Sequence, residues 1–229
     1  ILLAGCAGNP ATGGANVVFS SAAGETRTGE KMHAGIVAEG AIYDDPELQA
    51  YVRRVGERLA ANSDMPDLGF SFHVIDSPDI NAFALPGGYI YIHRGLLAYL
   101  DSEAELAAVL GHEIGHITAR HHARRQTAGI TNAVLATTAY ILTGSSDLAQ
   151  ASNMYGAELI SGYGRDMELE ADGLGAGYMH QSGYDPDAML EVIGVLKYQE
   201  QYQRLQAKSS GRPTSTYHGL YATRATTSA

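Results

Sequence analysis

Leu110-Gly111-His112-Glu113-Ile114-Gly115-His116 is the stretch that decides this fold, because it places two histidines four residues apart with a glutamate between them. Four residues advance an α-helix by just over one turn, so His112 and His116 share a face and can bind one metal ion. Glu113 is displaced around the helix, where it can reach a water on that ion without binding the ion. A catalytic zinc site keeps one position for such a water and lowers its pKa, and a carboxylate then acts as general base.

The residues around this stretch predict that it lies inside a buried helix. Ser102 and Glu105 have the spacing of a capping box, and apolar residues recur after them at helical spacing. With nine histidines in 229 residues, the pattern could also arise by coincidence. It falls about two to three turns into the predicted helix, however, where a metal site is expected. The recurring apolar residues are Leu106, Val109, Leu110, Ile114 and Ile117.

Composition and charge exclude several classes of protein. Apolar residues make up 45% of the chain and charged ones 17%, which is typical of a globular protein. The length suits one domain with a sizeable core. A net charge of −10 argues against nucleic acid as a partner, because binding to phosphates needs a basic face.

The single cysteine, Cys6, predicts a location in the cell envelope. Leu3-Ala4-Gly5-Cys6 has the form of a bacterial lipobox, in which the cysteine is lipidated and residues 1–5 are the remnant of a signal peptide. The alternative, a small buried cysteine, fits poorly with the Gly- and Ala-rich residues that follow. No stretch reaches the roughly 18 apolar residues of a membrane span. We therefore expect a periplasmic protein tethered by its lipid, and the absence of Asp after Cys6 favours the outer membrane.

The rest of the chain predicts one domain over residues 31–208, between a flexible tether (6–30) and an irregular tail (209–229). The metal-site helix is expected to continue to about Arg125, and the cations at its end suit a helix C-terminus. His73 and His93 lie in predicted strands and are interpreted as structural. Other helices are predicted over 31–42, 44–62, 96–100, 130–142, 147–181 with a break at 162–164, and 185–207, and strands over 70–75, 80–84 and 89–93.

Two histidines are too few for a catalytic zinc, so a third ligand is needed. Glu168 and Asp172 are four residues apart on a later predicted helix and share a face. One of them can bind the metal while the other accepts the remaining ring N–H of a ligand histidine. The alternative is an exposed acidic turn. Glu170 falls on the opposite side of this helix and is expected to be solvated.

Four motifs in order give the chain a resemblance to a known family. His112-Glu113-x-x-His116 followed by Glu168-x-x-Ala171-Asp172 resembles the zinc peptidases of the CaaX prenyl protease, HtpX and Oma type. Residues 81–91 and 183–186 resemble the bacterial periplasmic lipoprotein branch of that family (BepA- and LoiP-like). The resemblance covers roughly residues 45 to 205. It implies that His112, His116 and Glu168 bind zinc, that Glu113 is the base and that Asp172 supports a ligand.

The tail departs from the family pattern of a His-Pro pair followed by an arginine. His218 and Arg224 keep the interval between the histidine and the arginine, but Gly219 replaces the proline. Alternatively, the family's His-Pro pair is missing from this chain. Both residues are candidates for stabilising the oxyanion, and His218 is also a candidate fourth metal ligand that would close the site.

Together these features predict an α+β protein: a mostly helical, zincin-like (gluzincin) metallopeptidase domain with a small β-sheet beside the metal-site helix. We expect one zinc ion per chain and endopeptidase activity on unfolded or misassembled envelope proteins. The edge strand at Asn81, Ala82 and Phe83 is expected to align an extended substrate by adding it as a strand. The alternative is an envelope assembly factor or chaperone on the same fold, with a latent or closed zinc site.

Overall fold

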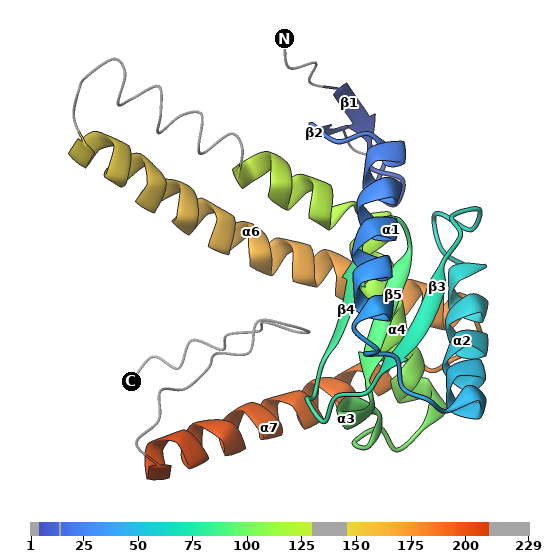
Figure 1. The fold of residues 1–229 in the computed structure, drawn as a ribbon. Helices are drawn as coiled ribbons and strands as arrows, with labels where there is room; N and C mark the ends of the chain where they lie inside the picture. The colour runs from blue at the N-terminus through green and yellow to red at the C-terminus, as the bar shows by residue number, and fades with distance from the viewer. Residues whose placement is uncertain (1–4, 14, 130–145, 211–229) are drawn as a thin grey trace.

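Helix α4 (Glu103–Thr118) lies at the centre of the fold in the computed structural model of the protein (Figure 1). The structure describes residues 5–13, 15–129 and 146–210. The Ser102 hydroxyl accepts a hydrogen bond from the Glu105 N–H at 3.1 Å, and the Glu105 carboxylate accepts one from the Asp101 N–H. The predicted cap is confirmed, and it starts the helix about three turns before the metal motif.

Three strands form the sheet beside α4. They are β3 (Ser71–Ile75), β4 (Ala82–Leu85) and β5 (Tyr89–His93), in the order β3-β5-β4. β4 and β5 form the predicted hairpin, whose turn uses Gly87 and Gly88 at φ values of 85° and 100°. β3 is parallel to β5, so β4 is left as an edge strand of a mixed sheet.

Each face of the sheet is covered by helices. Phe72 and Ile92 pack on the side of α4 and of α2 (Pro46–Ala60). The N-cap of α2 is Asp45, one residue after the predicted start of this helix at residue 44. Tyr91 faces the other side, where it packs with Ile36 of α1 (Ala22–Ala38). The sheet therefore lies between the metal-site helix and α1, as Figure 1 shows.

The N-terminal region differs from the predicted tether. β1 (Gly5–Gly8) pairs with β2 (Ala15–Val18), and α1 begins at Ala22 instead of near residue 31. The Ser21 hydroxyl accepts a hydrogen bond from the Gly24 N–H and so caps α1. The small residues that suggested a tether are compatible with a hairpin and a helix because these pack against the rest of the domain.

Two long helices complete the domain. α6 (Ser146–Gln181) is continuous through residues 162–164, where a break was predicted, and α7 (Ala188–Ser210) ends slightly later than expected. A short helix, α3 (Arg94–Leu97), joins β5 to the loop before α4. The helix predicted over residues 130–142 lies outside the described residues, as does the tail from residue 211.

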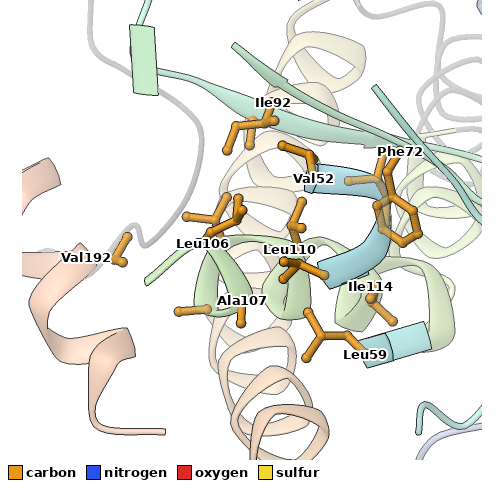
Figure 2. Close-up of a cluster of buried hydrophobic side chains, with 14 of the residues drawn as sticks. Val52, Leu59, Phe72, Ile92, Leu106, Ala107, Leu110, Ile114 and Val192 are labelled. Carbon is orange, nitrogen blue, oxygen red and sulfur yellow. The ribbon is translucent and has the colours of Figure 1, made fainter. Parts of the chain in front are cut away.

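The hydrophobic core surrounds α4. Side chains from α2, the sheet, α6 and α7 converge on the apolar residues of this helix (Figure 2). The predicted α+β class, mostly helical with a small sheet beside the metal-site helix, is confirmed. Labelled members of this core are Val52, Leu59, Phe72, Ile92, Leu106, Ala107, Leu110, Ile114 and Val192.

Candidate metal centre

The two histidines of α4 meet on one face of the helix, as their spacing predicts. Their Nε2 atoms are 2.9 Å apart, and their rings are nearly perpendicular with centroids 4.6 Å apart. His112 is completely buried and His116 is partly exposed. Each ring thus directs one nitrogen toward the same point, with access to solvent on the side of His116.

Glu168 of α6 supplies the third potential ligand. Its Oε2 atom lies 3.3 Å from the Nε2 of His112 and 3.6 Å from the Nε2 of His116. Tetrahedral zinc with bonds of about 2.0–2.1 Å would place its ligand atoms roughly 3.3–3.4 Å apart. The Oε2 atom is buried and makes no hydrogen bond in the structure, so it is an orphaned acceptor that faces the site. The two N···O distances lie near this spacing, while the two nitrogens, 2.9 Å apart, are somewhat closer. The donor set of two nitrogens and one oxygen fits zinc.

Close contact between the backbones of α4 and α6 brings Glu168 to the histidines. A Cβ atom added to Gly115 would lie 2.8 Å from the Ala171 carbonyl oxygen. One added to Gly175 would lie 2.8 Å from the His112 nitrogen. Glycine at both positions allows an approach that any side chain would prevent.

Asp172 lies one turn after Glu168, next to the other nitrogen of His112. Its Oδ1 atom is 2.8 Å from the His112 Nδ1. A hydrogen on Nδ1 directs the lone pair of Nε2 toward the metal position. Burial alone would lower the pKa of His112, but the hydrogen bond to Asp172 and the nearby carboxylate of Glu168 outweigh it and raise the pKa to about 9.

Glu113 lies on the side of α4 that faces the sheet. Its side chain is buried, and burial raises the pKa of its carboxyl above the ordinary value although the two histidines oppose the shift. The backbone N–H of Ala84, in β4, donates a hydrogen bond to this carboxylate. Glu113 is therefore held between the metal position and the edge strand.

The predicted substrate-binding residues Asn81, Ala82 and Phe83 lie at the start of the edge strand. The His93 N–H donates to the Asn81 carbonyl, so the backbone groups of Ala82 and Ala84 point away from β5. Phe83 stacks on Tyr91, on the face toward α1. The backbone groups of Ala82 and Ala84 are thus directed toward the free edge of the sheet.

Other predicted residues lie beyond what the structure describes. His218 and Arg224 fall in residues 211–229. Cys6 belongs to strand β1, where it pairs with Val17, but its side chain is not described.

The segment after α4 corrects the prediction of one helix continuing to Arg125. α4 ends at Thr118, Arg120 has a positive φ of 56°, and a second helical segment covers residues 121–129. The chain thus reverses direction at Arg120. An ion pair between Glu25 and Arg120 stabilises this reversal. Left-handed backbone at a residue other than glycine is uncommon, so nothing in the sequence pointed to this break.

Because of this reversal, Glu170 is paired where it was expected to be solvated. Its Oε2 atom accepts from Arg124 at 2.6 Å and lies 3.2 Å from the His121 Nε2. Its Oε1 atom accepts from the Asn9 amide at 3.0 Å. Residues 121–129 therefore cover the part of α6 that carries Glu170.

Fold and site together define a metallopeptidase of the HExxH class. The model of peptidase family M48 matches residues 46–224. The chain belongs to this family.

Three relatives illustrate what the chain is similar to. The chain is 35% identical to a beta-barrel assembly-enhancing protease of Yersinia pestis, over 72% of this chain and 36% of that protein. It is 32% identical to the protein of that name in Escherichia coli K12, over 80% of this chain and 41% of that protein. The mitochondrial metalloendopeptidase OMA1 of Arabidopsis thaliana is 33% identical, over 77% of this chain and 36% of that protein. The chain spans about two fifths or less of the length of these relatives.

Proposed function

We propose that the chain is a zinc-dependent endopeptidase that binds one zinc ion through His112, His116 and Glu168. The observation that carries the proposal is the convergence of these three ligand atoms, all within 4.8 Å of one another. Three protein ligands are typical of catalytic zinc, whereas structural sites use four. Family membership supports the same conclusion.

Zinc held by these three residues would act as a Lewis acid, lowering the pKa of a bound water and polarising the carbonyl of a peptide bond. Glu113 is the base that takes the proton of the water and passes it to the leaving amine. Its raised pKa suits the first of these tasks, because a carboxyl of higher pKa accepts a proton more readily. The hydrogen bond from Ala84 helps to orient the carboxylate.

The substrates we propose are unfolded or misassembled proteins of the cell envelope. An edge strand can bind an extended peptide through backbone hydrogen bonds, which depend little on side chains. Ala82 and Phe83 begin such a strand and Asn81 precedes it; Ala84 of the same strand contacts Glu113. The names of the bacterial relatives, beta-barrel assembly-enhancing proteases, agree with a role in the envelope.

Cleavage of an unfolded protein by the zinc-loaded chain tests this function. Reduced, carboxymethylated casein should be cut at internal bonds, whereas folded proteins should resist. A zinc chelator should stop the reaction, and added zinc should restore it. A folded, zinc-loaded chain that binds casein without cutting it would instead favour the assembly factor or chaperone.

We also propose that lipid on Cys6 anchors the protein to the outer membrane and holds it in the periplasm. Among the described residues, no helix has the length and apolar content needed to cross a membrane. The lipobox at residues 3–6 supports the proposal. Labelling with palmitate should mark the full-length protein and be lost in Cys6→Ser. Label that persists in this variant would contradict the anchor.

A further inference from the structure

His121 lies directly behind the metal ligand His116. Their Nδ1 atoms are 2.7 Å apart, and the two rings meet edge to face with centroids 4.9 Å apart. Residues five apart on a continuous helix point roughly 140° away from each other, so they could not make this contact. The left-handed backbone at Arg120 turns His121 back under His116.

The geometry assigns a direction to the hydrogen bonds behind His116. If the Nε2 of His116 binds the metal, the ring hydrogen of His116 is on its Nδ1. That N–H then donates to the Nδ1 of His121. The hydrogen of His121 is then on Nε2, 3.2 Å from the Glu170 Oε2. Both rings are neutral in this arrangement, and every donor has an acceptor.

Glu170 is held in place from both ends. Its ion pair with Arg124 and its hydrogen bond from Asn9 occupy its two oxygens. Arg124 also offsets part of the carboxylate charge. Like Asp172, Glu170 is a carboxylate that can accept a hydrogen bond from a histidine ring. Asp172 contacts a proposed ligand directly, whereas Glu170 contacts His121, which in turn contacts His116.

The same segment also orients Glu168. Arg125 donates to the Oε1 of Glu168 at 3.1 Å, which leaves Oε2 directed toward the metal position. Residues 121–129 thus contact two of the three ligands from behind.

We propose that His121 and Glu170 are positioning residues for zinc, which fix the ring and tautomer of His116. The proposal rests on the proposed zinc site. A hydrogen bond from a ligand histidine to an outer acceptor is typically worth about 10- to 100-fold in metal affinity. If the network serves folding alone, its loss would lower stability without a specific change in metal binding.

Variants of His121 separate these two roles. His121→Phe keeps the ring shape and removes the acceptor, so zinc affinity should fall by about 10- to 100-fold. His121→Asn places an amide oxygen near the former Nδ1 position and should recover part of the loss. Glu170→Gln keeps an acceptor for His121 without the charge, and a smaller loss is expected. Zinc affinity is measured by competition with a chromophoric chelator.

Two further measurements distinguish a specific effect of His121→Phe on the metal site from a general loss of stability. The visible absorption bands of Co²⁺ bound in place of zinc should change in His121→Phe, because they report the ligand geometry. Thermal unfolding of the metal-free protein measures stability separately. Asp76→Asn is a matched control, since Asp76 is ion-paired with Arg94 elsewhere in the domain, and zinc affinity should be unchanged.

Wild-type zinc affinity and unchanged Co²⁺ bands in all three network variants would overturn the inference. That result would leave the proposed function intact, because wild type would still bind zinc. Failure of wild type itself to bind zinc or to cleave casein would instead refute the proposed function. If His121→Phe does not fold, His121→Asn and Glu170→Gln still decide the question.

Discussion

Glu113→Gln is expected to bind zinc and fold normally while peptide hydrolysis falls by about 100- to 10,000-fold, the usual contribution of a general base. The amide keeps the size of the carboxylate and can still accept a hydrogen bond from the Ala84 N–H. It cannot take a proton from water at neutral pH. The loss should therefore appear in the rate of casein cleavage, with the zinc content unchanged.

Glu103→Gln is the matched control for this experiment. Glu103 lies in the first turn of the same helix, where its exposed carboxylate accepts a hydrogen bond from Tyr184. The same chemical change at this position should leave the cleavage rate near that of wild type. Cleavage by Glu113→Gln at the wild-type rate would remove Glu113 from the mechanism.

Glu168→Ala is expected to have the largest effect on the metal. The change removes one of three ligands, so zinc affinity should fall by more than the roughly 100-fold loss typical of an outer hydrogen-bond partner. The protein should lose zinc during dialysis against a weak chelator, and cleavage should be lost with it. Elemental analysis of the dialysed protein measures this directly.

Asp166→Ala is the control that tests whether removing any carboxylate from this part of α6 lowers the zinc content. Asp166 is exposed and lies two residues before Glu168, so its removal changes the charge equally without touching the site. Zinc content should be unaffected. Full zinc occupancy in Glu168→Ala would exclude Glu168 as a ligand.

The sequence predicted those parts of the site that depend on local spacing. His112 and His116 converge because they lie one turn apart, and the Ser102 cap determines where that helix begins. The position of Asp172 beside His112 likewise follows from its spacing after Glu168. Each of these features is governed by the period of a single helix.

Features that depend on tertiary structure were not predictable in the same way. Arg120 adopts a left-handed backbone that its residue type does not favour, and an ion pair with Glu25, distant in sequence, holds it. The pairing of Glu170, which was expected to be solvated, was likewise not predictable, because the chain reversal at Arg120 determines what covers this part of α6.

The glycine contacts between α4 and α6 have a consequence for which metal the protein selects. Gly115 and Gly175 let the two backbones touch, so the separation of the helices sets the distance between Glu168 and the histidines. Zinc needs bonds of about 2.0–2.1 Å, whereas calcium needs about 2.3–2.6 Å and more oxygen ligands. A larger residue at position 175 would widen the site and shift its preference away from small ions. In the proposed zinc site, selectivity would thus depend partly on positions that do not contact the metal.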